Sequence, residues 1–379
     1  MKSKSVLLSL DWYESRIHNG LLRYAQKKGW VLHADTHGLG FFQNLSVNGL
    51  ILSASSLAKG KKMAEELGAP FVFLFDVCEG SPSVCLDNSA IGRMAGKFFI
   101  ERNFKRVTAF FPHPYFLKKT FRDRIKGCEE ALFASGVLFD FYQRDRSLMS
   151  QSESKENNAK INFYKDYLKN APKPLGVFLM QDSDAVFLQL ACNDLGISIP
   201  EEVAILSVNN EPMICPYTPV PLSSIDPGWE NVGFYAGAML NSLLEGEDLE
   251  ELVKYIPPIG IEERLSSSII AVEDRRVADA VSYIWQKLDN DPSVDDICRA
   301  IRVPRRSLTA AFKKHLGRGV KEEVQLQRIK RIQSLLLETK LTTVEIAYKL
   351  NFRSEFYLYK FFKKHTGMTT KAYRKQIKP

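Results

Sequence analysis

The chain has 379 residues, of which 45% are hydrophobic and 25% are charged, and its formal net charge is +8. This length predicts two or three domains, and this composition is typical of globular proteins and excludes a disordered chain. No apolar run approaches the roughly eighteen residues that a membrane span needs, and the run at 6–10 is too short for a signal peptide. The six cysteines form no metal or disulfide pattern, so we expect core thiols in a reducing cytoplasm.

Residues 1–265 alternate between short β-rich runs and amphipathic helical stretches, which predicts parallel sheets in an α/β domain. The β-rich runs are 6–10, 49–53, 71–75, 83–86, 106–111, 137–142, 176–180 and 203–208. The helical stretches are 17–28, 58–67, 89–102, 122–135, 158–170 and 182–195.

The pattern changes near residue 265. Three serines and a charged run indicate a linker at 266–276, and residues 277–379 show helical periodicity almost throughout. This last part holds 22 basic and 10 acidic residues, a net charge of +12, whereas the first 276 residues have a net charge of −4. Such asymmetry predicts a polyanionic partner for the C-terminal domain alone.

The C-terminal domain contains an internal repeat. The segment FKKHLG at 312–317 recurs as FKKHTG at 362–367, and residues 296–298 are echoed by residues 345–347. Each copy predicts a helix, a tight turn and a second helix with an apolar back. We therefore expect helix-turn-helix motifs at about 293–316 and 343–365, joined by one helix at about 321–338.

The second helix of each motif has a basic and aromatic front that is suited to a DNA groove. Arginine and lysine can bind guanine edges or phosphates, and aromatic rings can contact thymine methyl groups. A single basic helix is usually only a solvated surface, but two in tandem favour DNA binding. The candidate DNA-binding residues are Arg305, Arg306, Thr309 and Lys313 in the first motif, and Arg353, Phe356, Tyr359, Lys360 and Lys363 in the second.

Residues 277–379 resemble the DNA-binding domain of the AraC family. The resemblance is carried by IAYKLNF at 346–352, by FKK at 362–364 and by GMTT at 367–370, followed by Tyr373 and Arg374. Asn351 stands where the family prefers glycine, and asparagine is the residue that best tolerates a left-handed conformation there. Leu358 and Thr370 replace a usual phenylalanine and a usual proline.

Residues 1–265 resemble the LacI-type periplasmic-binding-protein fold. The matching segments are RIKGC at 124–128, QD at 181–182 with Ala185, VNNE at 208–211 and LSSI at 222–225. LacI-type proteins carry a DNA-binding unit in front of this domain, and we expect none here because the first strand starts at Val6. A LacI-type sensor followed by an AraC-type reader resembles the XylR-like family of xylose-operon regulators. The resemblance implies a two-lobed α/β domain with parallel sheets, followed by an all-α domain with two helix-turn-helix motifs.

In the LacI-type fold the effector binds between two lobes, at the C-terminal ends of parallel strands. This predicts ligand contacts from Asp11, Tyr13, Arg16, Asp76, Arg124, Asp182, Asn209 and Trp229. Arg124, Asp182 and Asn209 could pair with sugar hydroxyls, while Trp229 and either Tyr13 or Trp12 could cover the sugar ring. Simpler interpretations are a helix N-cap for Asp182, a helix-surface arginine for Arg124 and a core residue for Trp229. Asn209 stands where the family carries aspartate.

No enzyme motif is present: the G-x-S-x-G and H-E-x-x-H patterns are missing, and the lysines at 61–62 lack the rest of a P-loop. We expect no catalysis, no cofactor and no metal. The sequence predicts a transcription activator controlled by a small sugar, above all a pentose such as xylose. We expect it to act as a homodimer on double-stranded DNA, in contact with RNA polymerase and away from membranes. The alternatives are a different ligand, an N-terminal domain that only dimerises, or an α/β enzyme fused to a DNA-binding domain.

Overall fold

The computed structural model describes residues 3–35, 46–53, 57–75, 77, 80–112, 119–144, 153–272, 274–339 and 341–377. The chain divides into two compact units. The first comprises residues 1–88 and 227–258, and the second comprises residues 89–226 and 259–379. The first unit is one α/β lobe, and the second contains another α/β lobe together with the helical C-terminal domain.

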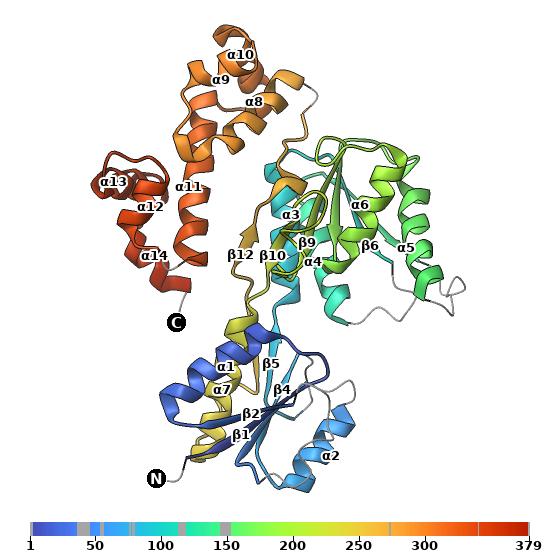
Figure 1. Cartoon of the computed structure of the whole chain (residues 1–379), viewed down its shortest axis with the longest axis vertical. Helices are drawn as coiled ribbons and strands as arrows, with labels where there is room; N and C mark the ends of the chain where they lie inside the picture. The colour runs from blue at the N-terminus through green and yellow to red at the C-terminus, as the bar shows by residue number, and fades with distance from the viewer. Residues whose placement is uncertain are drawn as a thin grey trace. The chain divides into compact units, whose positions relative to one another are not determined.

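The first lobe is built on a six-stranded parallel sheet in the order β11-β5-β4-β3-β1-β2. Its strands are β1 (Ser5–Leu10), β2 (Val31–Asp35), β3 (Gly49–Ser53), β4 (Phe71–Leu74), β5 (Ser83–Leu86) and β11 (Val253–Ile256). Helices α1 (Ser15–Lys28) and α7 (Trp229–Glu245) lie side by side over one face, and α2 (Leu57–Leu67) lies over the other (Figure 1). Every residue of β3 is buried, as expected for a central strand covered on both faces.

Two glycines allow α1 and α7 to pack closely. A Cβ at Gly20 would lie 1.9 Å from the backbone oxygen of Glu230, and a Cβ at Gly233 would lie 1.9 Å from that of Ile17. Any side chain at either position would force the helices apart. The crossing therefore depends on glycine on both helices.

The second lobe repeats this plan with the strand order β12-β10-β9-β8-β6-β7. Its strands are β6 (Arg106–Phe111), β7 (Leu138–Gln143), β8 (Leu175–Leu179), β9 (Val203–Val208), β10 (Ser223–Asp226) and β12 (Gly260–Glu262), of which only β12 pairs in the antiparallel direction. Helices α3 (Asn88–Glu101) and α4 (Lys119–Phe133) lie on one side of the sheet, and α5 (Glu153–Leu168) and α6 (Ser183–Leu195) lie on the other (Figure 1).

The serines at the start of the expected linker 266–276 belong to the second lobe. Leu265–Ser267 forms a short 3-10 helix in which Ser266 and Ser267 are buried. Ser266 Oγ donates to the backbone oxygen of Ile205 at 2.7 Å, and Ser267 Oγ lies 2.7 Å from Ser223 Oγ. Small hydroxyl side chains are used here to satisfy buried polar groups beside β9 and β10, rather than to keep a linker solvated. Ile270, a few residues later, already packs in the core of the C-terminal domain.

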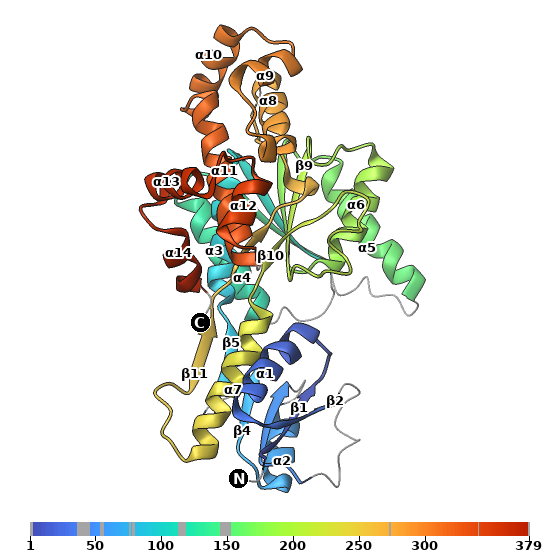
Figure 2. The same ribbon diagram turned by 60° about the vertical axis from the view of Figure 1, so that its left-hand side comes forward.

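The C-terminal domain is entirely helical over its described residues. Its helices are α8 (Arg275–Gln286), α9 (Val294–Ala300), α10 (Arg305–Leu316), α11 (Val320–Glu338), α12 (Thr343–Lys349), α13 (Glu355–Thr366) and α14 (Thr370–Ile377). One core surrounds Phe312 and Ile284, and a second surrounds Phe362 and Leu336. Helix α11 runs from the first helix-turn-helix motif to the second (Figure 2). The two parallel-sheet lobes and the helical domain confirm the predicted fold class.

Candidate nucleic-acid interface and effector-binding residues

The first helices of the two helix-turn-helix motifs begin in the same way. Ser293 caps α9 and forms a capping box with Asp296: each backbone N–H donates to the other residue's side chain, at 3.2 Å. Thr342 caps α12 and forms the same box with Glu345, at 2.6 and 3.2 Å. The first helices of both motifs are therefore fixed by the same local arrangement, a reciprocal capping box.

The second helices of the motifs, α10 and α13, are two-faced. Leu308 and Phe312 of α10 are fully buried, as are Leu358 and Phe362 of α13. Both helices end at a left-handed glycine. The nine side chains predicted to bind DNA are all exposed: Arg305, Arg306, Thr309, Lys313, Arg353, Phe356, Tyr359, Lys360 and Lys363.

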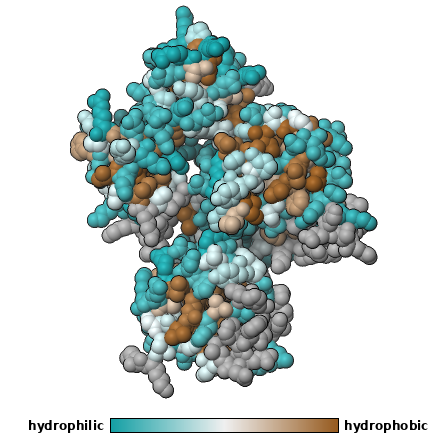
Figure 3. Space-filling view, viewed as in Figure 1, coloured by the Kyte–Doolittle hydropathy of each residue, from teal (hydrophilic) through white to brown (hydrophobic). Residues whose placement is uncertain are grey.

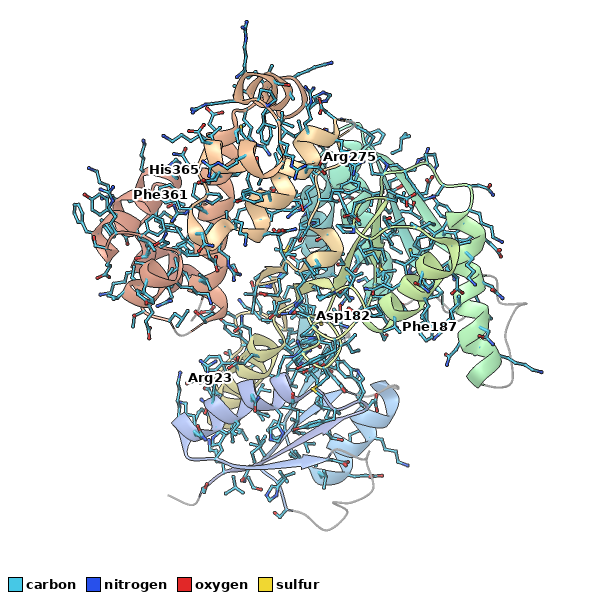
Figure 4. All side chains as sticks on the ribbon, turned by 45° about the horizontal axis from the view of Figure 1, so that its top comes forward. Arg23, Asp182, Phe187, Arg275, Phe361 and His365 are labelled. Atoms are coloured by element: carbon cyan, nitrogen blue, oxygen red, sulfur yellow. The ribbon has the colours of Figure 1, made fainter. Side chains whose placement is uncertain are left out.

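The exposed faces combine positive charge with aromatic area. Phe356 is 66% exposed, although a large apolar side chain is normally buried when it has no partner. Arg305 forms an exposed ion pair with Asp295 at 3.0 Å. Hydrophilic residues cover most of the surface around α10 in Figure 3. Phe361 and His365 lie together on α13, with their ring centroids 4.7 Å apart (Figure 4).

An aromatic cluster marks the predicted effector residues of the first lobe. The ring of Trp12, just after β1, stacks on that of Phe75, just after β4, with centroids 5.5 Å apart. Both rings meet Trp229, the first residue of α7, edge to face at 5.5 and 5.7 Å. Trp229 is only 5% exposed, whereas Trp12 is 47% exposed. Phe75 was missing from the prediction, although its place at the end of a β-rich run could have indicated it.

The other predicted residues of the first lobe have varied surroundings. Tyr13 is exposed and its hydroxyl lies 2.7 Å from His18 Nδ1. The guanidinium of Arg16 donates to both carboxylate oxygens of Glu14 at 2.7 Å. The Asp11 backbone is fixed to Ser53, and its side chain is exposed. Asp76 lies outside the described residues.

Arg124 of α4 is a buried arginine rather than a helix-surface one. It is 5% exposed, and its Nη1 donates at 2.6 Å to the backbone oxygen of Met180, which directly follows β8. Burial lowers the pKa of Arg124 to about 10, and the nearby Asp182 opposes this shift. The guanidinium therefore stays charged at neutral pH, beside the carboxyl ends of the parallel strands.

Asp182 lies at the start of α6 but does not cap it through its side chain. Asp182 is 1% exposed. Its carboxylate accepts hydrogen bonds from the hydroxyls of Ser207 and Ser224 and from the Glu211 N–H, the last at 2.7 Å. Burial raises the pKa of Asp182, and these hydrogen bonds oppose the rise. The carboxylate thus holds the loop after β9 in place.

That loop carries Asn209 in a left-handed conformation, with φ 116°, followed by Asn210 with φ 49°. Asparagine is one of the few residues that adopt such angles readily. The Asn209 N–H donates to the backbone oxygen of Ile225 at 3.0 Å, and the Arg264 guanidinium donates to Asn210 Oδ1 at 2.9 Å. The structure brings Arg124, Asp182 and Asn209 to one edge of the second lobe's sheet.

Two parts of the chain match known families. Residues 97–267 match the periplasmic binding protein-like domain, and residues 297–376 match a helix-turn-helix domain. The chain joins a periplasmic binding protein-like domain to a helix-turn-helix domain. The first match includes Arg124, Asp182, Asn209 and Trp229, and the second includes both recognition helices.

The chain is homologous to xylose operon regulatory proteins. It is 28% identical over 209 residues to that of Escherichia coli strain K12, covering 55% of this chain and 53% of the relative. The protein of the same name from Haemophilus influenzae is 28% identical over 208 residues, covering 55% and 54%. The chain spans about half the length of these curated relatives. The melibiose operon regulatory protein of Escherichia coli strain K12 is 24% identical over 99 residues, which are 26% of this chain and 33% of that protein.

Solved structures share the fold. A xylose-binding transcription activator has a TM-score of 0.61 and 22% identity, with all of both chains covered. A LacI-type regulator from Alkaliphilus metalliredigens, in complex with D-xylulofuranose, has a TM-score of 0.54 and 20% identity, covering 70% of this chain and 99% of that one. These likenesses establish that both lobes and the helical domain follow a known architecture.

The described residues contain no group of three or more histidine, cysteine, aspartate or glutamate side chains placed to hold a metal ion. The described helices include none with the length and apolar character that a membrane span requires. Cys85, Cys128, Cys192 and Cys215 are buried and belong to no disulfide among the described residues, and burial raises the pKa of Cys192 to about 12.

Proposed function

We propose that the chain is a sequence-specific DNA-binding transcription regulator whose α/β lobes bind a small sugar. The observation that carries the proposal is a repeated structural unit. Two helix-turn-helix motifs begin with a capped helix, and the second helix of each has a buried apolar face and an exposed face. Such a repetition is not needed if the exposed faces only contact solvent. Two equivalent exposed helix faces are suited to bind two successive segments of the DNA major groove.

The length of α11 supports this use of both motifs at once. Its 19 residues give a helix about 28 Å long, which is close to the roughly 34 Å of one DNA turn. Recognition helices near its two ends can therefore address neighbouring major-groove segments on one side of the duplex. Arginine and lysine on these helices supply phosphate and guanine contacts, and Phe356 supplies an apolar contact.

The proposed effector is a small sugar, with xylose as the first candidate because the homologous proteins are named as regulators of a xylose operon. In the first lobe, the exposed ring of Trp12, backed by Phe75 and Trp229, suits the C–H face of a sugar ring. In the second lobe, Arg124 and Asn209 supply hydrogen-bonding groups for hydroxyls. Asp182 is committed to the loop after β9, so we assign it a positioning role there.

A regulator of this kind works on chromosomal DNA, which places its action in the cytoplasm. We propose a homodimer, because pairing two chains multiplies the DNA contacts through effective concentration. We further propose that the bound regulator acts as an activator that contacts RNA polymerase. The N-terminal domain then serves as a sensor rather than as an enzyme.

The test is a selection of randomised duplex DNA by the full-length protein, followed by binding measurements on the recovered duplexes at several salt concentrations. The proposal predicts an enriched sequence with two motifs about one helical turn apart, and an affinity that falls steeply with salt. Failure to enrich any sequence, together with no binding to random duplex at low salt, would overturn it. Calorimetric titration with pentoses and hexoses tests the effector separately.

A further inference from the structure

Arg328, in the middle of α11, makes contacts that join the two helix-turn-helix motifs. Its side chain is almost fully buried, with 4% exposure for the residue. Buried arginines are rare, because an ionised group loses its hydration, and they persist where several partners replace the water. The partners of Arg328 come from both sides of the linking helix.

On the side of the first motif, Arg328 Nη1 forms an ion pair with Asp291. Asp291 ends a short 3-10 helix in a left-handed conformation, two residues before Ser293, which caps α9. The ion pair therefore holds the point at which the first motif begins.

On the side of the second motif, Arg328 Nη2 donates to the backbone oxygen of Leu350 at 2.7 Å. Leu350 is the C-cap residue that follows α12, directly before the turn that leads to the recognition helix α13. The guanidinium also lies over the ring of Phe352 at 4.1 Å, and Phe352 packs on Phe361 of α13 at 5.5 Å. Arg328 is thus connected to the turn and to the recognition helix of the second motif.

The chemistry of these contacts requires arginine. The ion pair with Asp291 and the hydrogen bond to Leu350 use different nitrogens of one planar group, whose flat face covers Phe352. A lysine ammonium could keep the charge for Asp291 but could not hold all three contacts in this geometry. An apolar side chain of similar length would fill the space and make none of the polar contacts.

We propose that Arg328 is a positioning residue that fixes the separation and relative orientation of the two DNA-reading helices. It acts without touching DNA, by tying the start of the first motif to the turn of the second. This inference rests on the proposed DNA-binding function. Its specific consequence is that Arg328 sets how strictly the protein demands one spacing between the two motifs of its DNA site.

The experiment compares the full-length wild type with Arg328→Met on a duplex selected by the wild type, and on the same duplex with one or two base pairs inserted between the two contacted segments. We expect each insertion to weaken wild-type binding by about tenfold or more. For Arg328→Met we expect weaker binding to the original duplex and an insertion penalty below about threefold. An unchanged insertion penalty in a folded Arg328→Met protein would overturn the inference.

The matched control is Arg331→Met on the same helix. Arg331 approaches Asp289, on the side of the first motif, at 3.8 Å. The Arg331→Met protein should show the same loss of affinity on base-pair insertion as the wild type. If circular dichroism shows that Arg328→Met does not fold, the test uses Arg328→Lys and Asp291→Asn instead. For each of these variants we expect an insertion penalty between that of the wild type and that expected for Arg328→Met. A wild-type penalty in both would overturn the inference.

A second readout needs no DNA and separates this inference from the proposed function. Spin labels carried by unnatural amino acids at Lys314 and Lys364, equivalent exposed positions on α10 and α13, report the distance between the readers. We expect a narrow distance distribution in the wild type and a broader one in Arg328→Lys. Equally narrow distributions would contradict the positioning role, whereas failure of the wild type to bind any duplex would contradict only the proposed function.

Discussion

Arg302 and Asn351 occupy the same place in the two helix-turn-helix motifs, 49 residues apart, and both adopt a left-handed backbone, with φ 56° and φ 54°. Each residue follows the C-cap of the first helix, which is Ile301 or Leu350, and begins the turn to the recognition helix. The turn therefore demands a conformation that only glycine and, to a lesser degree, asparagine adopt readily. The second motif meets this demand with asparagine, and the first meets it with a strained arginine.

This difference predicts unequal gains in stability when glycine replaces the two residues. Arg302→Gly should stabilise the helical domain by up to about 1 kcal/mol, because relief of about 1–2 kcal/mol of left-handed strain exceeds the entropic cost of glycine. Asn351→Gly should change stability by less, since asparagine already tolerates the turn. Hydrogen exchange of the amides in α9 and α12 measures both. A destabilised Arg302→Gly protein would contradict this account of the turn.

The DNA contacts predict losses confined to the exposed faces of the recognition helices. Arg306→Ala or Lys360→Ala should each weaken binding to a selected duplex by about 1–3 kcal/mol if the side chain reads a base edge. The base preference at one position should relax at the same time. Arg275→Ala, on α8 and 92% exposed at its side chain, is the control and should have little effect. Wild-type affinity in both recognition-helix variants would show that the DNA-binding faces are wrongly placed.

The effector contacts predict a graded series at Trp12. Trp12→Ala should weaken pentose binding by at least about tenfold because it removes the exposed aromatic face, while Trp12→Phe should retain most of the affinity. Calorimetric titration with xylose and related pentoses measures both. Tyr217→Ala, which removes a 79% exposed ring from the second lobe, should bind as the wild type does. A Trp12→Ala protein with unchanged affinity would remove the aromatic cluster from the site.

Arg124 provides an independent test in the second lobe. Arg124→Lys keeps the charge but not the planar group that bonds to Met180, so pentose affinity should fall while the helical domain still binds DNA. Because Arg124 is buried, the unfolding temperature of the variant must be measured beside its affinity. A stable variant with wild-type pentose affinity would exclude Arg124 as a ligand contact.

Asp274 predicts a loss of stability in acid. It caps α8 by accepting from the Arg276 N–H, and hydrogen bonding to Arg276 lowers the pKa of Asp274 from 3.8 to about 2. A carboxyl group whose pKa is lower in the folded state stabilises it above the unfolded pKa, so this contribution should disappear as the pH falls from about 4 to about 2. Asp274→Ala should cost about 0.5–2 kcal/mol at neutral pH and abolish that part of the pH dependence. Urea unfolding at several pH values measures the difference, and equal pH profiles would contradict it.

The sequence predicted the strands and helices well where the spacing of the apolar residues followed one clear period. The strands at 6–10 and 203–208 and the helices of the repeated motifs have plain apolar patterns, and the structure contains them. The edge strands β2, β11 and β12 and the helix α7 were missed. Edge strands are half exposed and carry mixed side chains, so their two-residue period is weak, as in the pattern of β11, which is buried only at Ile256.

The candidate site shows a similar division. The exposure of the residues on α10 and α13 that are predicted to bind DNA follows from the helical period, because burying Leu308 and Leu358 fixes the opposite face. The environment of Asp182 could not be predicted, since its partners Ser207, Ser224 and Glu211 come from separate strands and loops. The role of Arg328 could not be predicted from the sequence either. Its contacts form only because the turn at 350–352 packs against α11 in the folded domain.

The most direct test of the central claim, that sugar binding and DNA binding are coupled in one regulator, is a calorimetric titration of the full-length protein with xylose, without and with saturating selected duplex. The account predicts that DNA changes the xylose Kd by about fivefold or more, and that xylose changes the DNA Kd by the same factor, because linkage between two binding sites is reciprocal. Xylose Kd values that are equal in the two titrations would contradict the claim.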